Sequence, residues 1–512
     1  MYLSEHKTLR MFTLCLLYVA QGIPWGFVTV TFAAWLATPE HGISTDQLGK
    51  ILAVASLPWS FKFLWGPLMD RFTIPSLGRR RPWIIFAQGM AILVLASLLA
   101  VDDLAGMVWA GTANAGPVWR TLYELIPGPL AAVILLANVF MSMQDVAVDA
   151  LAVDLLQEKE RGIANGLMYG SSYAGTAIGG AGLGYVVANY GIQAGLLTQA
   201  LLLFVIMLLP LCVRERPQSA GTRLAGGRLM GTHSSGNGQG DPPDQREVDR
   251  GAPDRIDFGE TPTLHLQTDP MPTQPMPTSG SASQKQSPAS AAGTPETNDG
   301  LRPLSSESVL RNLIRAFSLR STILGAGVAI GVKIGIGVLT AVLVDFLIKD
   351  GGWTQQQYTS VTGGWALLLG LSGAAMGGFA SDRFGARLLI FTVSVLIGTL
   401  WIAFGFLETL IDRHSFVVVL LLGQEFLLAM LSVSLFSLFM TISWPRVAAT
   451  QFTAYMSLMN LSTTIGSYLA GQLSASMTIH QILLVSGVLQ ILLVIPVLLI
   501  DTQQARRTLP SE

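Results

Sequence analysis

Apolar runs long enough to cross a membrane recur along the whole chain of 512 residues. The hydrocarbon core of a bilayer is ~30 Å thick, so a helix needs about 20 apolar residues to span it. Only 12% of the residues are charged, against roughly 25% in soluble proteins. A transmembrane barrel would show shorter segments, of about ten residues, with alternating hydropathy. The sequence therefore predicts an all-α, polytopic membrane protein.

Twelve transmembrane helices are expected, in two sets of six. The first set covers 11–36, 47–69, 83–101, 129–156, 162–188 and 191–213, and the second covers 318–347, 356–380, 386–408, 415–441, 447–475 and 480–500. The fifth span is rich in small residues and is predicted to pack closely against a neighbour. The expected domains are an N-terminal six-helix bundle (1–213), a linker (214–309) and a C-terminal six-helix bundle (310–512).

The segment between the two sets has a different composition. It is rich in Pro, Gly, Ser, Thr and Gln, and Phe258 is its single aromatic residue. Such a segment buries too little apolar surface to offset its ordering entropy, which predicts disorder. Two interpretations of VLRNLIRAFSLR (309–320) stay open. It is either an amphipathic helix on an anionic membrane surface or a plain continuation of the seventh span.

The basic residues of the loops predict the orientation. One side has few, namely Lys50, Arg120, Lys349 and Arg413. The other side has the linker arginines and also Lys7, Arg10, Arg71, Arg79, Arg80, Arg81, Lys159, Arg161, Arg383, Arg387, Arg446, Arg506 and Arg507. Because cytoplasmic loops carry the excess of Lys and Arg, both termini and the linker are expected in the cytoplasm.

A short motif occurs twice, at equivalent points of the two sets. GPLMDRFTIPSLGRRR (66–81) ends the second span and GFASDRFGAR (378–387) ends the eighth; the shared residues are Gly66, Asp70 and Arg71, and Gly378, Asp382 and Arg383. Two copies in register indicate parallel repeats of a transporter. We expect the glycines to allow close helix approach, the aspartates to lie near a helix N-terminus and the arginines to bind acidic partners. The alternative is a pair of ordinary basic loops.

Charged residues also lie inside the spans, where charge is costly and usually functional. In QDVAVDALAVD (144–154), Asp145 and Asp149 share a helix face, whereas Asp154 lies on the opposite face, nearer the cytoplasm. Lys62 lies ~12 Å deeper in the membrane than Asp70, and Asp145 lies ~13 Å deeper than Asp154. If Asp70 and Asp154 both mark the cytoplasmic edge, Lys62 and Asp145 lie at a similar depth. Lys62 is therefore a candidate partner of Asp145 or Asp149. These residues are either a coupling site or a structural ion pair. Asp154 is expected to hold the loop, with Arg71 as its candidate partner.

The remaining candidates are single polar residues in apolar runs. Lys333 lies in the seventh span, Gln424 and Glu425 lie in the tenth, Gln21 lies in GIPWG's helix and Gln451 opens the eleventh. Glu425 is the counterpart of the Asp145 region, since the fourth and tenth spans are equivalent in the repeat. Each lone polar group is either a ligand for a solute or a helix–helix hydrogen bond.

Several stretches resemble known transporters. YVAQGIP, FKFLWGPLMDR, GRRRPW and QDVAVDA resemble the AmpG-type muropeptide permeases and the related acetyl-CoA transporters, and GVKIGIGV, GQEFLLAM and ATQFTAYMSLMN agree better with the permeases. The repeated motif resembles the signature loop of the major facilitator superfamily. The resemblance implies proton-driven import of a large polar, often anionic solute. It also implies functional roles for Lys62, Asp145, Asp149, Lys333 and Glu425.

Two other functions are compatible with the same residues. An exporter of a drug or metabolite with the same fold is one alternative, and a non-transporting membrane sensor is another. The sequence has no Gly-x4-Gly-Lys-Ser/Thr phosphate loop, no nucleophile–base motif and no metal-ligand cluster, so an enzyme is not expected. We expect no cofactor beyond a proton gradient and no nucleic-acid partner. The expected partners are the lipid bilayer and a small solute, for a monomer in the bacterial inner membrane.

Overall fold

The computed structural model describes residues 2–72, 78–108, 126–156, 158–215 and 306–509. The predicted linker lies almost wholly outside these residues, so its disorder stays a prediction. Within them the chain is helical, apart from loops and isolated bridges such as that between Tyr2 and Arg214.

The N-terminal half contains six long helical segments, several of which change their helix type on the way. The fourth and sixth are α7 (Pro129–Leu155) and α10 (Ile192–Cys212). The first, second, third and fifth are composite: α1 (Lys7–Gly26), η1 (Phe27–Phe32) and α2 (Ala33–Leu36); α3 (Thr45–Ser60), η3 (Lys62–Leu64) and α4 (Trp65–Arg71); α5 (Arg81–Ser97) and η4 (Leu98–Ala100); α8 (Glu158–Ala177), η6 (Ile178–Gly182) and α9 (Leu183–Tyr190). The loops carry η2 (Pro39–His41) and η5 (Ala105–Met107).

The C-terminal half repeats this plan after a short helix, α12 (Ser306–Phe317). Its segments are α13 (Arg320–Gly331) with α14 (Ile334–Lys349); α15 (Gln355–Ser360), η7 (Val361–Trp365) and α16 (Ala366–Phe384); α17 (Ala386–Phe406); α19 (His414–Ile442); α20 (Ala448–Ser474); and α21 (Ile479–Val494) with η9 (Ile495–Leu499). The short pieces are α18 (Glu408–Ile411), η8 (Pro445–Val447) and α22 (Gln504–Thr508).

These segments follow the predicted spans to within a few residues. Among the described residues, ten helices are long and apolar enough to cross a membrane. The fifth predicted span (α8 to α9) and the eleventh (α20) are also long helices, but they are rich in Gly, Ser and Thr and are not among the ten. The all-α, multi-pass architecture is confirmed, whereas the count of twelve spans stays a prediction.

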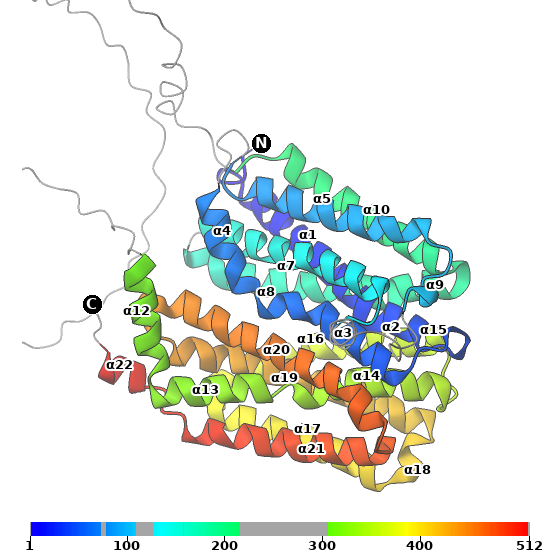
Figure 1. Ribbon diagram of the computed structural model, residues 1–512. Coiled ribbons are helices and arrows are strands. Elements are labelled where there is room, and N and C mark those ends of the chain that lie inside the picture. The colour runs from blue at the N-terminus through cyan, green and yellow to red at the C-terminus, as the bar shows by residue number, and fades with distance from the viewer. Residues whose placement is uncertain (1, 73–77, 109–125, 157, 216–305, 510–512) are drawn as a thin grey trace, which may run out of the picture. The chain divides into compact units, whose positions relative to one another are not determined.

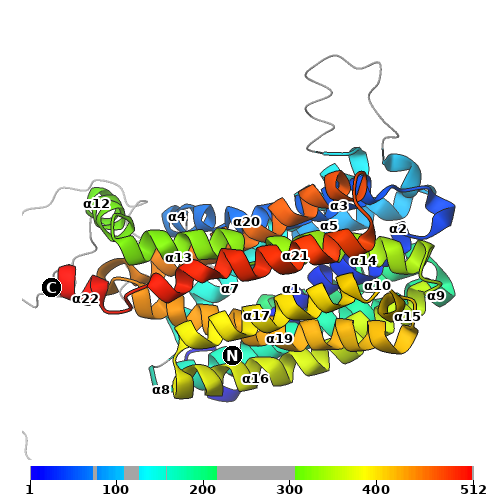
Figure 2. The ribbon, with the colours of Figure 1, turned by 90° about the horizontal axis from the view of Figure 1, so that it is seen from below.

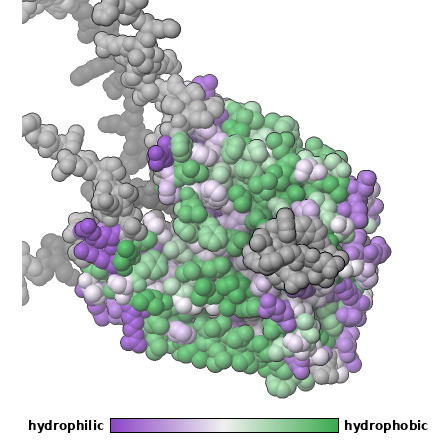
Figure 3. All heavy atoms as spheres, viewed as in Figure 1, coloured by the Kyte–Doolittle hydropathy of each residue, from purple (hydrophilic) through white to green (hydrophobic). Residues whose placement is uncertain are grey.

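The long helices run side by side, and both termini lie at one end of them (Figures 1 and 2). We call this the arginine-rich end, because it carries Arg71 and Arg383. Figure 3 shows a hydrophobic flank over the helices, with hydrophilic residues gathered at the two ends. An apolar flank is what the hydrocarbon core requires, since no water is available there to solvate polar groups.

Two helices break at the lysines inside the spans. Phe61, before Lys62, has φ −112° and ψ 11°, and Lys333 has nearly the same conformation, with φ −111° and ψ 7°. Pro58 precedes the first break and cannot donate a helical hydrogen bond. At the second break, the Lys333 amide donates to Ser462 Oγ of α20 at 2.9 Å. Broken helices form binding sites in many transporters, so both breaks are candidate binding positions.

Helix α12 is separate from the seventh span. It ends at Phe317, and Leu319 is extended, with φ −73° and ψ 138°, before α13 begins. Figure 1 shows α12 crossing the arginine-rich end at a steep angle to α13. The plain continuation of the seventh span is therefore wrong, whereas the placement of this helix on an anionic membrane surface stays a prediction.

Glycines allow the closest helix approaches. A Cβ on Gly22 of α1 would lie 2.1 Å from Ser172 O of α8, and one on Gly175 would lie 2.3 Å from Val19 O. The close packing predicted for the fifth span is thus confirmed. Between the two halves, a Cβ on Gly363 would lie 2.4 Å from the Ala181 backbone nitrogen. This last contact joins two π-helical segments, η6 and η7.

A polar latch joins the halves at the end opposite the arginines. Lys349 Nζ lies 2.7 Å from Asp345 Oδ1 and donates to Ile43 O at 2.6 Å, while Thr45 Oγ1 donates to Asp345 Oδ2 at 2.5 Å. Asp345 is 8% exposed. The latch therefore ties the start of α3 to the end of α14 in a poorly hydrated position, where charge-assisted hydrogen bonds are strong.

We expect Lys349→Gln to open this end. Losing a hydrogen bond to a charged group costs about 1.5–3 kcal/mol, which shifts a two-state equilibrium roughly tenfold or more. Spin labels at Glu40 and Gln356, with Cys15 and Cys212 changed to serine, should gain a longer distance component in pulsed electron resonance. Asp350→Asn removes an exposed charge beside the latch and should leave the distances unchanged. Unaltered distances in Lys349→Gln would show that the latch does not hold the halves.

Candidate functional site

A charged cluster lies in the middle of the N-terminal half. Lys62 Nζ lies 3.3 Å from Asp145 Oδ2, and their side chains are only 15% and 13% exposed. Asp145 is ten residues from the end of α7, hence ~15 Å along the helix, or about half of a ~30 Å hydrocarbon core. Of the two candidate partners of Lys62, Asp145 is therefore the one that forms the ion pair, at the break between α3 and η3.

Asp149 has a different partner. The Tyr18 hydroxyl of α1 donates a hydrogen bond to Asp149 Oδ1, one helical turn from Asp145. Lys62 also lies within electrostatic range of Asp149. Tyr18 could not be found from the sequence, because a single tyrosine in an apolar run does not reveal which helix it faces. We call Lys62, Asp145, Asp149 and Tyr18 the N-terminal charged cluster.

Unpaired donors and aromatic rings adjoin this cluster. Trp25 lies one turn after Gln21 in α1, and its ring meets that of Trp59 edge-on, with centroids 6.3 Å apart. Trp59 in turn lies one turn before Lys62. Gln21 Nε2 and Trp59 Nε1 are buried and have no acceptor among the described residues. A buried donor left unpaired costs about 1–3 kcal/mol, so both donors are suited to a polar ligand.

A second charged cluster lies in the C-terminal half. Lys333, at the break before α14, and Glu425 of α19 lie within electrostatic range of each other. Tyr173, from α8 of the other half, faces the same place: a Cβ on Gly370 of α16 would lie 3.0 Å from Tyr173 Cε1 and 3.4 Å from Glu425 Oε1. We call Lys333, Glu425 and Tyr173 the C-terminal charged cluster. It draws on side chains of both halves.

Two predicted ligands hold helices together instead. Gln424 Oε1 accepts a hydrogen bond from Trp401 Nε1 of α17 at 3.1 Å. Gln451 Oε1 accepts from the Trp444 amide at 2.9 Å, and its Nε2 donates to Thr322 Oγ1 at 3.2 Å. Both side chains are engaged within the C-terminal half, which favours the helix-packing interpretation for Gln424 and Gln451.

The suggested partner of Asp154 needs correction. Asp154 Oδ2 lies 3.0 Å from Arg80 Nε, whereas Arg71 is exposed and lies over the Phe72 ring, with 5.9 Å from Cζ to the centroid. The aspartate thus contacts the loop, but through the N-cap residue of the next helix, Arg80, rather than through Arg71. The side chain of Asp70 lies outside the described residues.

The glycines of the repeated motif do not mediate close packing here. A Cβ on Gly66 would meet nothing within 4 Å, and one on Gly378 would meet only Val433 Cγ1 at 3.9 Å. This part of the prediction is wrong; in the second copy, α16 approaches α19 most closely at Gly373 and Gly377, which precede Gly378.

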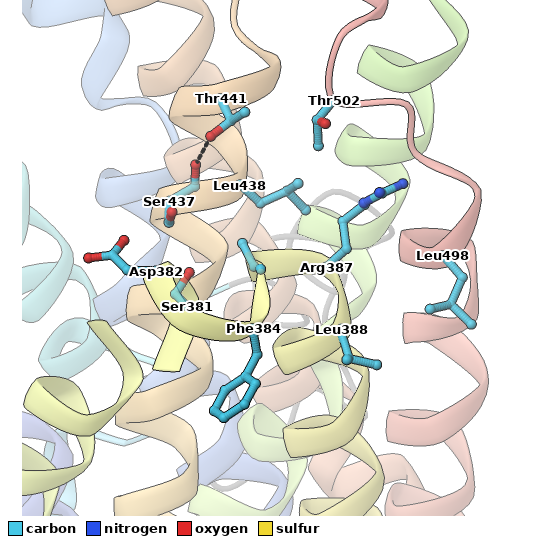
Figure 4. A pocket seen from close by; sticks show the side chains of 12 residues that line it. Ser381, Asp382, Phe384, Arg387, Leu388, Ser437, Leu438, Thr441, Leu498 and Thr502 are labelled. Carbon is cyan, nitrogen blue, oxygen red and sulfur yellow. Dashed lines mark hydrogen bonds between the residues drawn. The ribbon is translucent and has the colours of Figure 1, made fainter. Parts of the chain in front are cut away.

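The second copy of the motif borders a cavity of about 610 Å³ at the arginine-rich end (Figure 4). Asp382, Arg387 and Thr441 are among its lining residues. Arg387 Nη1 donates to Ile500 O at 2.6 Å, whereas Asp382 and Arg383 are exposed. The motif therefore offers charges to an open space rather than to a closed contact.

A carboxylate that sequence reasoning missed fixes the first copy of the motif. Glu215, just after α10, accepts hydrogen bonds from the amides of Arg79, Arg80 and Arg81 at 2.9, 2.8 and 2.6 Å. These amides open α5, where the helix dipole favours a negative charge. Gly78 has φ +108°, and a Cβ there would lie 2.7 Å from Glu215 Cδ. The only signal in the sequence was a carboxylate directly after an apolar run.

The N-terminal charged cluster predicts unequal effects of its two ion-pair partners. Lys62→Met leaves two carboxylates together without a cation, and removing one partner of a buried pair costs about 3–5 kcal/mol. Asp145→Asn should cost less, because Asp149 remains one turn away as a partner for the lysine. Thermal unfolding of the purified protein in detergent measures both, with Lys62→Arg as the charge-preserving control. Equal destabilisation by Lys62→Met and Asp145→Asn would contradict this arrangement.

Comparisons with known proteins also indicate a transporter. Residues 10–192 match the family described as acetyl-coenzyme A transporter 1. The anhydromuropeptide permease of Escherichia coli (strain K12) is 29% identical over 161 residues, which are 31% of this chain and 28% of the permease. The putative transporter AmpG 4 of Rickettsia conorii is 29% identical over 188 residues, 36% of this chain and 40% of that protein. Each match thus spans less than half of the relative.

Solved structures match over nearly the whole chain. A nucleoside transporter, NupG, has a TM-score of 0.60 at 11% identity, covering 96% of this chain and 99% of its own. A D-xylose-proton symporter has a TM-score of 0.61 at 12% identity, covering 96% and 97%. These relatives and neighbours carry the names of transporters, not of enzymes. The protein therefore has the major facilitator fold and resembles the AmpG-type permeases and acetyl-CoA transporters.

Proposed function

We propose that this protein is a secondary active transporter that imports a large polar or anionic solute, muropeptide-like in kind, by proton-coupled alternating access. The observation that carries the proposal is the pair of charged clusters, each with a lysine at a break in a membrane-spanning helix, one within the N-terminal half and one shared by both halves. Ionisable groups at such depth are costly and are retained for ion or substrate pathways. A non-transporting sensor has no evident need for them.

The proton-coupling role falls on the carboxylates. Three carboxylates are involved: Asp149 bound to the Tyr18 hydroxyl, Asp145 beside Lys62, and Glu425 near Lys333. Each can bind a proton when its interaction with the neighbouring lysine is lost. A solute anion that binds Lys62 or Lys333 competes with the carboxylate for the lysine. Protonation of that carboxylate then accompanies solute binding, which couples the two ligands.

The solute chemistry follows from the groups left unsatisfied. Gln21 Nε2 and Trp59 Nε1 offer donors without acceptors, the lysines offer positive charge, and the indoles of Trp25 and Trp59 offer apolar faces. A solute with sugar-like rings, amides and an acidic group uses all three. The E. coli relative is named for anhydromuropeptides, and the matching family is described by acetyl-CoA, so these are the two solutes to compare.

The remaining parts of the proposal concern the frame. The two six-helix bundles, 1–213 and 310–512, would rock about the clusters, with 214–309 linking them. The repeated motifs with Asp70, Arg71, Asp382 and Arg383 would gate the arginine-rich end, which is cytoplasmic, and Asp154 would hold the first of them. The polar latch at Lys349 would then close the outer side. The expected setting is the bacterial inner membrane, with the protein as a monomer.

The test is uptake of labelled anhydro-muropeptide into proteoliposomes, with and without an inward proton gradient. The proposal expects accumulation that depends on the gradient. Acetyl-CoA should compete only if the site favours the second solute. Solute movement only outward under the same gradient would support the exporter alternative, and binding without movement would support a sensor.

Asp149→Asn should abolish accumulation driven by the gradient. The amide cannot take up a proton, so uptake should fall to the level seen without a gradient, while thermal unfolding in detergent stays close to that of the original protein. Asp350→Asn is the matched control, because Asp350 is exposed and lies beside the polar latch, away from the charged clusters. This variant should transport normally. Normal accumulation by Asp149→Asn would remove this residue from the coupling mechanism.

A further inference from the structure

Six exposed arginines gather at the arginine-rich end of the C-terminal half. They lie on α12, at the start of α13, on η8 and on α22, namely Arg311, Arg315, Arg320, Arg446, Arg506 and Arg507. Figure 1 shows α12 and α22 at the same end of the long helices, and Figure 3 shows hydrophilic residues there. We call this surface the arginine platform.

The arginine platform is built on a core of its own. Ala316 of α12, Trp444 beside η8 and Ala505 of α22 belong to one buried cluster, separate from the main core. The Phe317 ring packs against that of Tyr455, with centroids 6.0 Å apart. These contacts hold α12 across the helix ends, so its outward face is presented in a fixed position.

Hydrogen bonds attach α22 and the residues just before it to the start of α13. Gln504 Oε1 accepts from the Ser321 amide at 2.8 Å, and the Asp501 amide donates to Ser321 Oγ at 2.9 Å. Two carboxylates belong to this part of the chain: Asp501, just before α22, has its Oδ2 3.7 Å from Arg507 Nη1, and Glu307 lies in the first turn of α12. The positive charge of the surface is therefore only partly offset.

The exposed face of α12 combines charge with an apolar side chain. Ile314 is 64% exposed and lies between Arg311 and Arg315, one turn or less from each. An isoleucine exposed to water gains nothing, whereas an amphipathic helix in the headgroup region buries such a residue while its arginines meet lipid phosphates. Guanidinium groups bind phosphate in a bidentate manner.

We propose that the arginine platform binds the headgroups of anionic phospholipids in the leaflet that faces the cytoplasm. The proposal rests on the orientation given above, because the cytoplasmic leaflet holds the negative surface potential that attracts such arginines. Lipid fits better than a soluble anion, since α12 crosses the ends of membrane helices and carries Ile314 between two arginines. Bound lipid would fix α12, and with it the entry of the chain into the seventh span.

The test uses the full-length protein in nanodiscs of phosphatidylglycerol and phosphatidylcholine, with the lipids retained on extraction counted by native mass spectrometry. The original protein should retain phosphatidylglycerol preferentially. Arg311→Gln with Arg315→Gln should reduce that retention, roughly fivefold for each arginine removed. Phosphatidylcholine retention should not change. Arg413→Gln, an exposed arginine at the opposite end, is the matched control and should behave as the original protein does.

Equal retention of the two lipids by the original protein, or an equal loss in Arg413→Gln, would overturn the proposal. Displacement of the lipid by inorganic phosphate at matched ionic strength would do so too, by showing a general anion site. A second measurement needs no substitution and so does not depend on folded variants. Photoactivatable phosphatidylglycerol should cross-link to 311–320, 444–447 and 501–507 in the unaltered protein. Cross-links confined to the spans would exclude the arginine platform.

Discussion

The structure depends on keeping ionised side chains inside a membrane-sized helical bundle. A charge at the centre of a bilayer is costly, so such a side chain faces the interior of the bundle and pairs with an oppositely charged group. The ion pair of Lys62 and Asp145, at 3.3 Å, is the clearest instance. The helix break at Phe61 brings the lysine out of the regular helical path toward α7, so the backbone conformation serves the charge pair.

The rest of the architecture supports movement around these charges. Glycines bring α1 against α8, and Gly363 against the backbone of η6, so each close contact rests on backbone rather than on long side chains. Such contacts form and separate without rearranging a side-chain core. The latch of Lys349, Asp345 and Thr45 adds a polar interaction between the halves. A two-state transporter needs contacts of this kind, strong enough to hold and few enough to release.

Much of the fold could be predicted from sequence, because membrane spans follow directly from apolar length. The similar depth of Lys62 and Asp145 in the membrane could also be predicted, since depth along two helices is set by the rise per residue. Partners across helices could not. Tyr18 faces Asp149, and Arg80 rather than Arg71 faces Asp154, because helix rotation and loop paths decide these contacts. Gln424 was a candidate ligand for the same reason. In a uniformly apolar helix, the sequence does not show that this side chain faces Trp401.

The central claim is that solute entry and proton entry are one process at the charged clusters. It is tested most directly by a pH-sensitive dye inside proteoliposomes that hold the full-length protein, with no initial gradient. The account predicts that adding anhydro-muropeptide outside acidifies the interior, and that Asp149→Asn abolishes this acidification while still binding the solute. Entry of labelled solute without any change of internal pH would contradict it.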